Sequence, residues 1–594
     1  MFDEVFINEH VAYNYNLDHI EGFEDFGRRG RTHRKANHVL VFQVKVLSTG
    51  YTQPIAFHPV NGTCPKETLA MLLTDVITTL KSKNIETVCS ISDQGPTNQG
   101  AISILRSQCE EGKHDPVYKV AGLRVIHLWD FPHLLKNIRN NLLTSDLLYK
   151  DKLAEWKHVI QEFFKLDEGI CKISKLTYAH LCPVGRNKMT VKLALQVFSE
   201  SASTGMKTFH HLSGGKFLSN ALPTAEFLGL MDKLTDAVNG PSRHDKPKVH
   251  RCDVTQDSFH HSYWREMIVE LQKWVFIRKD GGKHVPPCIH GFTDNLRALG
   301  WIWNRMKELG FEVMKLRLFN QDTLELYFGQ ARQTCGSGTD PTLQQFIAGM
   351  KTLLVQCVSA PLRESNCSNS AEDSDTHIND VTEILSEIIS ELQDDEDPQN
   401  PTLMRAYGHG DARVLPSYTK LMRQGPSLNC ATICSKILSC VELCPTCTEN
   451  LTTENNSSDF LLQGMRENST IEKPCPNLTN LFLKTEKEVV KDWDSFAWKP
   501  NVRAEVIKKM EEVDSFGWLN CEEHGKLVSD LVKQQVTSKI LASQCKNINQ
   551  ARQATKKRQT RQLQWKTVSI DEGQGLEDIH QRDWHLLTGV KGKI

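Results

Sequence analysis

The fold is decided by an apolar stretch near the N-terminus, His38–Leu47, which reads HVLVFQVKVL. Its β-branched and aromatic residues are typical of a buried strand. Working outward, residues 2–7 predict the end of an earlier strand, and residues 52–58 predict a later one after a turn that contains Gly50. The chain is therefore expected to begin with three strands.

Helical and strand-like stretches then alternate as far as residue 130. In chain order they are a helix over residues 67–81, a short strand over 87–92 (TVCSIS) that ends at Asp93, a helix over about 99–106, and a strand over 123–129 (LRVIHLW) that ends at Asp130. Three strands, a helix, a strand, a helix and a strand is the order of the ribonuclease H-like fold. Many α/β domains share pieces of this order, so the order alone is weak support.

Composition divides the remainder of the chain. Residues 134–354 are mostly helical in pattern, whereas residues 362–400 are acidic with little apolar sequence. We expect an α/β chain whose ribonuclease H-like catalytic domain is interrupted by a large, mainly helical insertion, with a mixed, partly disordered C-terminal region. The expected domains are the core in two parts, 1–145 and 311–360, the insertion at 146–310, an acidic linker at 361–400, a C-terminal region at 401–545 and a basic tail at 546–594.

The composition also limits the classes of function. The net charge of −1 means that any DNA-binding surface has to be local. No apolar run approaches the roughly 18 residues of a membrane span. The first ten residues, MFDEVFINEH, lack the basic and apolar parts of a signal peptide. We therefore expect no membrane partner, and reduced cysteines in the cytosol or nucleus.

Three carboxylates stand at positions where metal-dependent phosphodiester chemistry could use them. Asp3 lies in the first strand, Asp93 ends another strand, and Glu325 lies within a probable helix, NQDTLELYFGQAR. Two-metal cleavage needs acidic oxygens around cations about 3.5–4 Å apart. From spacing alone, the alternative is that these are ordinary solvated or capping carboxylates.

Several stretches carry a resemblance that favours the metal site. They are Phe2-Asp3-Glu4 with Gly22-Phe23-Glu24-Asp25, VLVF over 39–42, Ser92-Asp93-Gln94-Gly95 with Asn98, DFPHLLKNIRNN over 130–141, and NQDTLELYFG over 320–329. In these motifs the chain resembles the P-element-type transposases, a family that includes the THAP-domain transposases of animals. The resemblance covers roughly residues 2–350 and continues more faintly to about 535. It implies a cut-and-paste DNA transposase whose Asp3, Asp93 and Glu325 form a DDE-type site for Mg²⁺ or Mn²⁺.

The long segment between Asp93 and Glu325 has a further implication. In the family it is an insertion that binds GTP without hydrolysing it and helps to hold substrate DNA. No phosphate-binding GxxxxGK[ST] loop occurs here, so only the resemblance points to GTP. The resemblance implies contacts from Lys192, Asp236, Asn239 and Asp322. The alternative places Lys192 and Asp236 on solvated helix faces.

Residues beside the acidic motif have two interpretations each. Asp130 and His133 either contact the metal site or DNA, or Asp130 simply caps the following helix. Lys136 and Arg139 either face phosphate or form part of a solvated helix face.

The C-terminal region contains a pattern of zinc ligands. Cys444 and Cys447 form a CxxC, and Cys521 and His524 form a CxxH. Four N and S ligands are what structural zinc prefers. Buried, unligated cysteines are the alternative, and three other cysteines could compete as ligands: Cys430, Cys434 and Cys440.

The expected partners are transposon ends, target DNA, GTP and further copies of the chain, and the expected location is the nucleus. A basic segment, RQATKKRQTRQLQWK over 552–566, could contact phosphates or direct nuclear import, or could be a solvated helix face. The family usually begins with a THAP zinc domain and a coiled coil, and we expect both to be missing here. The alternative function is a truncated or domesticated, non-catalytic relative that binds DNA or GTP as a regulator.

Overall fold

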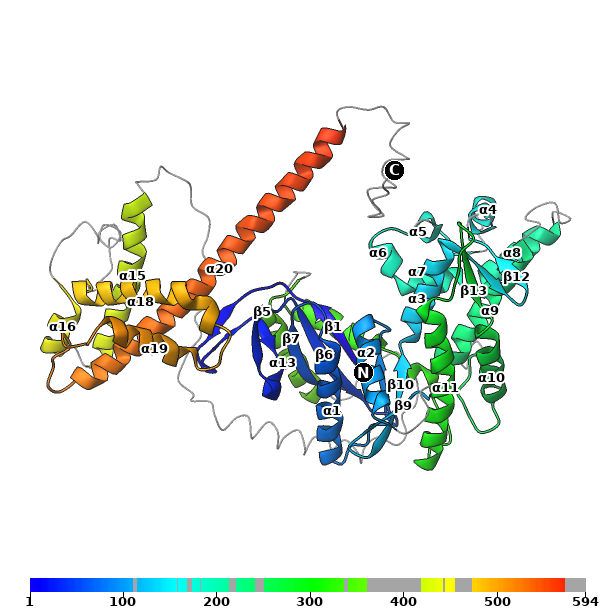
Figure 1. The fold of residues 1–594 in the computed structure, drawn as a ribbon, viewed down its shortest axis with the longest axis horizontal. Coiled ribbons are helices and arrows are strands. Elements are labelled where there is room, and N and C mark those ends of the chain that lie inside the picture. The colour runs from blue at the N-terminus through cyan, green and yellow to red at the C-terminus, as the bar shows by residue number, and fades with distance from the viewer. Residues whose placement is uncertain are drawn as a thin grey trace. The chain divides into compact units, whose positions relative to one another are not determined.

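The computed structural model describes residues 1–109, 115–156, 159–167, 174–181, 183–212, 221–240, 250–335, 340–359, 418–441, 444–453 and 473–571. They divide into two compact units, and Figure 1 labels many of their elements. The first unit holds Met1–Asn8 and Asn37–Asp395, and the second holds Glu9–Ala36 and Glu396–Ile594.

Two small sheets form the centre of the first unit. In one, β6 lies between β1 and β7 and pairs antiparallel with both, and Asp3 of β1 faces Val41 of β6. In the other, β10 pairs parallel with β8 and antiparallel with β9, and β1 lies beside β8. The elements are β1 (Phe2–Phe6), β6 (His38–Lys45), β7 (Thr52–Val60), α1 (Lys66–Ser82), β8 (Cys89–Ser92), α2 (Pro96–Ser107), β9 (Val117–Val120) and β10 (Leu123–Trp129). This is the predicted ribonuclease H-like arrangement, with β9 as an unexpected addition.

Helices from distant parts of the sequence pack on these sheets. They are α3 (Phe131–Leu142), α11 (Pro287–Glu308), the short η2 (Leu316–Leu318), α12 (Asp322–Thr334) and α13 (Leu343–Ser359). Helix α11 packs on β10 and α3, because the buried Asn295 side chain accepts a hydrogen bond from Trp129 N (2.8 Å) and donates one to Trp129 O (2.6 Å). Residues 287–308 were expected in the insertion, but in the structure they pack on β10 and α3 of the core.

The insertion contains a sheet that its mostly helical pattern did not predict. Strand β11 pairs antiparallel with β12 and β13, and β13 with β14. Because Leu147 of β11 faces Phe276 of β13, this sheet joins the two ends of the insertion. The elements are β11 (Ser145–Tyr149), β12 (Lys152–Ala154), α4 (Val159–Leu166), α5 (Tyr178–Leu181), α6 (Arg186–Met189), α7 (Val191–Val197), α8 (Glu200–Leu212), α9 (Ala221–Asn239), α10 (His260–Leu271), β13 (Val275–Arg278) and β14 (Lys283–His284).

The second unit combines C-terminal helices with two hairpins from the N-terminal region. Its elements are β2 (Ala12–Asn14), β3 (His19–Glu21), β4 (Phe23–Asp25), η1 (Gly27–Arg29), β5 (Arg31–Lys35), α15 (Tyr418–Cys440), α16 (Pro445–Leu451), α18 (Pro476–Phe496), α19 (Val502–Val513) and α20 (Gly525–Asp571). Residues 9–36 were expected in the ribonuclease H-like core. They belong here because Val11, Ile20 and Phe23 are buried in the same apolar cluster as α15, α18 and α20.

Side-chain contacts confirm this assignment. The Asn549 side chain of α20 accepts from Val11 N (3.1 Å) and donates to Val11 O (2.8 Å). Arg552, in the predicted basic segment, donates to the carbonyl oxygen of Glu9 and pairs with its carboxylate. The Arg552 side chain therefore binds Glu9 within the second unit. The side chains from residue 556 onward lie outside the described residues.

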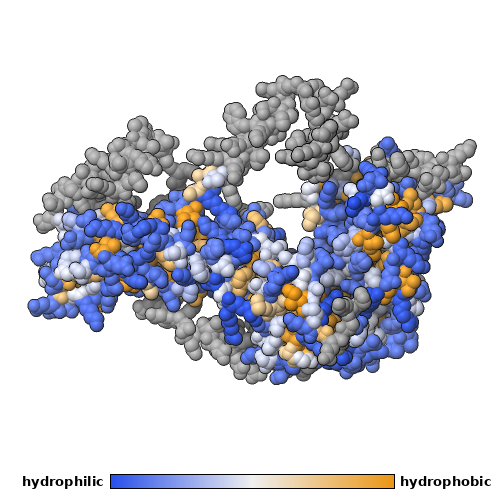
Figure 2. All heavy atoms as spheres, viewed as in Figure 1, coloured by the Kyte–Doolittle hydropathy of each residue, from blue (hydrophilic) through white to orange (hydrophobic). Residues whose placement is uncertain are grey.

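The acidic linker at 361–400 also lies outside the described residues. None of the described helices is long and apolar enough to span a membrane. Hydrophilic side chains cover most of the face drawn in Figure 2, and the apolar ones gather in small patches between them.

Candidate active site and metal centre

Two strands position the aspartates. Pairing of β1 with β6 holds Asp3 within a sheet, and Asp93 follows the last residue of β8. Asp93 Oδ1 accepts hydrogen bonds from Asn98 Nδ2 (2.5 Å) and Gly95 N (3.1 Å), both at the start of α2. The turn that leads into α2 therefore orients the Asp93 carboxylate.

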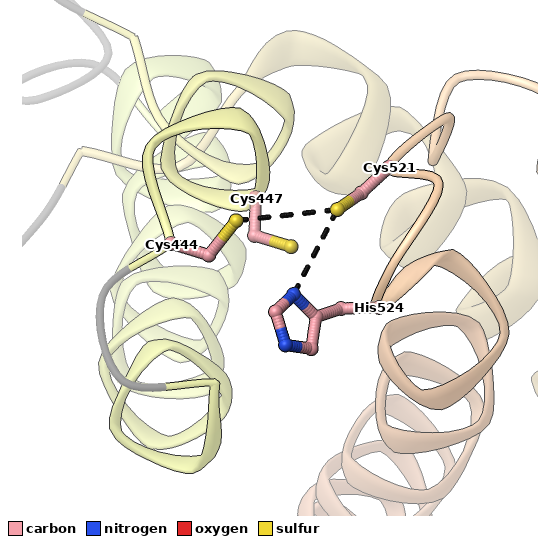
Figure 3. Close-up of side chains that lie close together, drawn as sticks. All are labelled: Cys444, Cys447, Cys521 and His524. Atoms are coloured by element: carbon pink, nitrogen blue, oxygen red, sulfur yellow. Dashed lines mark hydrogen bonds between the residues drawn. The ribbon is translucent and has the colours of Figure 1, made fainter.

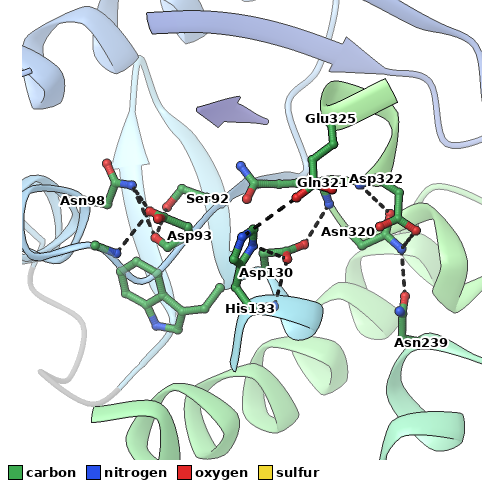
Figure 4. Close-up of polar contacts among 12 residues, drawn as sticks. Ser92, Asp93, Asn98, Asp130, His133, Asn239, Asn320, Gln321, Asp322 and Glu325 are labelled. Carbon is green, nitrogen blue, oxygen red and sulfur yellow. Dashed lines mark hydrogen bonds and ion pairs between the residues drawn. The ribbon is translucent and has the colours of Figure 1, made fainter. Parts of the chain in front are cut away.

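The third carboxylate is positioned by Gln321, the residue before α12. Its side chain donates to the carbonyl oxygen of Phe2 (2.7 Å), and its backbone N–H donates to Asp130 Oδ1 (2.8 Å). These bonds fix the start of α12, which carries Glu325, against the strand that carries Asp3 and the end of β10 (Figure 4). Gln321 belongs to the NQDTLELYFG motif, but the sequence alone predicted no role for this residue.

His133 lies between the carboxylates of Asp130 and Glu325. Its Nδ1 is 2.8 Å from Asp130 Oδ2, and its Nε2 is 3.8 Å from Glu325 Oε1 (Figure 4). Asp130 Oδ2 also accepts from His133 N (3.2 Å), so Asp130 does cap α3 as one interpretation held. The capping interpretation of Asp130 is therefore confirmed, while its role beside a metal site or in contacting DNA stays a prediction.

The electrostatics show that these groups act on one another. Burial and the negative charge of Asp93 raise the pKa of Asp3 to about 7. Burial also raises the pKa of Glu325, while the charge of His133 opposes that rise. Although burial lowers it, the hydrogen bond and charge of Asp130 leave the pKa of His133 above its ordinary value. Asp3 therefore lies within electrostatic reach of Asp93 and of His133, whose ring also lies 3.8 Å from Glu325.

The basic residues of α3 behave differently from the prediction. Lys136 and Arg139 are both buried, which excludes a solvated helix face. Arg139 donates to the carbonyl oxygens of Asn187 (3.4 Å) and Lys188 (3.0 Å). Its guanidinium thus ties α3 to α6 instead of facing phosphate, whereas Lys136 lies within the electrostatic reach of Asp93, Glu325 and Asp130.

Three of the four residues expected to contact GTP lie near one another. Asn320 Nδ2 donates to Asn239 Oδ1 (2.8 Å) and to Asp322 Oδ2 (3.1 Å), which links α9 to the start of α12 (Figure 4). Asp236 lies one helical turn before Asn239 and is buried in an ion pair with Arg251 (2.8 Å). The solvated-face alternative is therefore wrong for Asp236. The solvated-face alternative is confirmed for Lys192, because this residue is exposed in the first turn of α7.

The predicted zinc ligands come together in the second unit. Cys444 precedes α16, Cys447 lies within it, and Cys521 and His524 lie in the turn before α20 (Figure 3). Cys444 Sγ is 4.0 Å from Cys521 Sγ, which is 3.8 Å from His524 Nδ1. All four ligand atoms lie within 4.8 Å of one another. Tetrahedral zinc with bonds of about 2.3 Å places its sulfurs roughly 3.8 Å apart, so the cluster has suitable dimensions.

Cys521 differs electrostatically from the buried cysteines of this unit, because burial raises the pKa of Cys447 and of Cys430 to about 12. A hydrogen bond from the His524 backbone N–H lowers the pKa of Cys521 to about 7, and zinc binds the thiolate form. The competing cysteines make other contacts: Cys430 donates to Leu478 O, Cys434 to Leu451 O and Cys440 to Lys436 O. Within the described part of the chain, the Cys444, Cys447, Cys521 and His524 cluster is the tightest candidate metal group, and the three carboxylates are spread more widely.

Comparisons with known proteins agree with this organisation. Family models match the TNP-like RNase H N-terminal domain at residues 1–106, the TNP-like GTP-binding insertion domain at 132–251 and the TNP-like RNase H C-terminal domain at 318–351. The fold is similar to that of the Drosophila P element transposase strand transfer complex, with a TM-score of 0.50 and 22% identity over 60% of this chain and 75% of that chain. A comparison with curated proteins found no match.

The fold and the order of the matched segments define a ribonuclease H-like protein interrupted by a GTP-binding insertion domain. Three segments of the chain are thus similar to the TNP-like RNase H and GTP-binding insertion domains, and its fold is similar to that of the Drosophila P element transposase.

Proposed function

We propose that this chain cleaves DNA phosphodiester bonds and joins DNA strands, with Asp3, Asp93 and Glu325 as ligands of Mg²⁺ or Mn²⁺. The main support is that Gln321 and His133 hold the start of α12, which carries Glu325, beside the strand that carries Asp3 and beside Asp130. The donor set fits, because Mg²⁺ prefers carboxylate oxygens. A pair of such cations would stabilise the attacking and leaving oxygens of an in-line displacement.

The residues of the chain have separate tasks in this proposal. Asn98 and Gly95 bind one oxygen of Asp93 and so orient the other toward the site. His133 and Lys136 supply positive charge that opposes repulsion among the carboxylates. The Glu325 side chain is 51% exposed, which leaves this edge accessible to a DNA strand.

The test is metal-dependent cleavage of DNA carrying the ends of the element by the full chain. Wild-type protein should cleave in Mg²⁺ or Mn²⁺, and Asp93→Asn should reduce the rate by at least about 100-fold, because metal ions supply several kcal/mol of charge stabilisation. Glu86→Gln, at an exposed carboxylate paired with Arg305, is the matched control. Equal cleavage by wild type and Asp93→Asn would refute the proposal. DNA binding without any cleavage would favour the non-catalytic regulator.

We also propose that GTP binds beside Asp236, Asn239 and Asp322, with Lys192 as a phosphate or base contact. The support is that Asp236 already accepts paired N–H donors from Arg251, which resemble the N–H donors of guanine. Titration with a fluorescent GTP analogue should show binding that Asp236→Asn weakens. Unchanged affinity in that variant would exclude the proposed guanine contact.

Three further proposals complete this function. Zinc at the Cys444, Cys447, Cys521 and His524 cluster would have a structural role, because four protein ligands leave no open position. The chain would work as a homo-oligomer in the nucleus, a proposal supported by its resemblance to P-element-type transposases and by the basic segment over 552–566. Metal analysis, sedimentation and imaging of a tagged chain test these three proposals in turn.

A further inference from the structure

The side chain of Gln321 has an oxygen atom that no other residue binds. Its amide nitrogen donates to the carbonyl oxygen of Phe2 (2.7 Å), and its backbone N–H donates to Asp130 Oδ1 (2.8 Å). Because the carbonyl oxygen of Phe2 can only accept, the amide nitrogen has to face it, and the amide oxygen Oε1 has to face the other way. Among the described residues, no group donates a hydrogen bond to this buried oxygen.

A buried oxygen of this kind is unusual in this protein. Gln321 is only 1% exposed, so bulk water does not solvate its amide. In the part of the chain that the structure describes, the other buried side-chain atoms without a hydrogen bond are nitrogens or hydroxyl oxygens, and Gln321 Oε1 is the only carbonyl-type oxygen among them. A native structure usually satisfies such an acceptor with an ordered water or an ion.

The contacts of Gln321 place this oxygen at the edge where the catalytic carboxylates are proposed. Phe2 comes directly before Asp3 in β1, so the bond to Phe2 brings the Gln321 amide beside the strand that carries Asp3. Glu325 lies four residues after Gln321, and side chains at this spacing share one face of a helix. The backbone bond to Asp130 ties the same residue to the end of β10 (Figure 4).

The neighbouring carboxylate of Asp130 is already occupied by protein donors. Its Oδ1 accepts from Gln321 N (2.8 Å). Its Oδ2 accepts from His133 N (3.2 Å) and lies 2.8 Å from His133 Nδ1. Of these two adjacent side chains, Gln321 is therefore the one that keeps an oxygen without a protein donor.

We propose that Gln321 Oε1 is a further ligand of the divalent cations that the three carboxylates are proposed to hold. The inference rests on the proposed function, because it needs those cations. Carbonyl oxygens suit Mg²⁺ and Mn²⁺ as ligands. A neutral amide also adds an oxygen without adding negative charge to a site that already contains three carboxylates. Gln321 thus has two tasks: its nitrogen holds the start of α12 against β1, and its oxygen binds metal.

The test is a calorimetric titration of the full chain with Mn²⁺ in the absence of DNA. The same titration of D93N gives the binding that does not depend on the carboxylate site, and this background is subtracted. Q321L removes the oxygen and the N–H together. It should weaken the remaining Mn²⁺ binding at least about tenfold, the lower end of what groups around a metal contribute to its affinity.

A glutamate at the same position separates a metal ligand from a purely structural residue. Q321E keeps an oxygen but has no N–H to donate to Phe2, and it should bind Mn²⁺ at least as tightly as wild type, because carboxylate is the preferred ligand. If Gln321 acts only through its bond to Phe2, Q321L and Q321E should both weaken Mn²⁺ binding. Equal weakening in the two variants, or wild-type affinity in Q321L, would overturn the proposal.

The matched controls are Q330L and Q330E, which make the same changes at an exposed position of α12 and should bind Mn²⁺ like wild type. Thermal unfolding without metal checks that every variant is folded. Failure of the proposed function gives a different result: wild type and D93N would then bind Mn²⁺ identically. If D93N loses binding and Q321L does not, the carboxylate site stands and only the role of Gln321 is refuted.

Discussion

The two candidate metal centres are built in different ways. The Cys444, Cys447, Cys521 and His524 cluster has all its ligand atoms within 4.8 Å of one another, drawn from two pairs with short internal spacing. The carboxylates come from three separate parts of the chain: Asp93 accepts hydrogen bonds from Asn98 and Gly95, and Glu325 lies 3.8 Å from the His133 ring. The first arrangement suits a closed structural site, and the second suits an open site that substrate can enter.

This difference predicts that metal loss has a different consequence at each of the two centres. Loss at the cysteine and histidine cluster should damage folding, whereas loss at the carboxylates should damage chemistry and leave the fold intact. Cys521→Ser and Glu325→Gln separate the two outcomes when stability, metal content and cleavage are measured on the same protein.

The largest effect is expected for Cys521→Ser. The variant should lose its bound zinc, and the unfolding midpoint of the second unit should fall by at least about 10 °C, because metal binding and folding are coupled. Metal analysis and calorimetry of the full chain provide the measurements. Cys440→Ser, at an exposed thiol outside the cluster, should change neither quantity. Retention of zinc and of the midpoint by Cys521→Ser would show that no structural metal is bound there.

Glu325→Gln should have the next largest effect, on chemistry alone. Cleavage should fall by at least about 100-fold, because an amide oxygen is a much weaker ligand for a divalent cation than a carboxylate. The unfolding midpoint and the zinc content should stay at wild-type values. Glu312→Gln, at an exposed site on the same stretch of chain, is the control. If Glu325→Gln also lowers the unfolding midpoint, the loss of cleavage would reflect unfolding and a purely chemical role would be contradicted.

Asn295→Ala tests whether α11 belongs to the core. The variant leaves the N–H and C=O of Trp129 without their hydrogen-bond partner in a buried position, which should cost about 3 kcal/mol of unfolding free energy. Urea denaturation measures this value. Arg297→Ala, on a partly exposed face of the same helix, should change stability by less than about 0.5 kcal/mol. If both variants are equally stable, α11 is not an essential part of the core.

The smallest effect is expected for Asn320→Ala. Asn320 bridges Asn239 and Asp322, so its loss should weaken GTP binding by about fivefold, equivalent to one hydrogen bond of about 1 kcal/mol. Fluorescent-nucleotide titration provides the affinity. Gln330→Ala, at an exposed position on α12, should leave it unchanged. If Asn320→Ala binds GTP as tightly as wild type does, the hydrogen bonds of Asn320 with Asn239 and Asp322 do not contribute to GTP binding.

Much of the core could be predicted because its signals are local. The apolar run at 38–47 and the short strands that end at Asp93 and Asp130 have periodicities that depend only on neighbouring residues. The pairs Cys444 with Cys447 and Cys521 with His524 were recognisable for the same reason, since each pair lies within one turn. The sheet of the insertion was missed because β11 to β14 are too short to carry a clear alternation.

The sequence by itself determined the main strands and helices of the core, the candidate metal ligands and the family resemblance, because each of these depends on short runs of residues. Only the tertiary structure decided which runs share a core: that residues 9–36 pack with C-terminal helices, and that residues 287–308 cover β10. It also showed that Arg139 is committed to backbone carbonyls. The physical reason is that burial and hydrogen bonding between distant segments depend on the packing of whole elements, which no local pattern records.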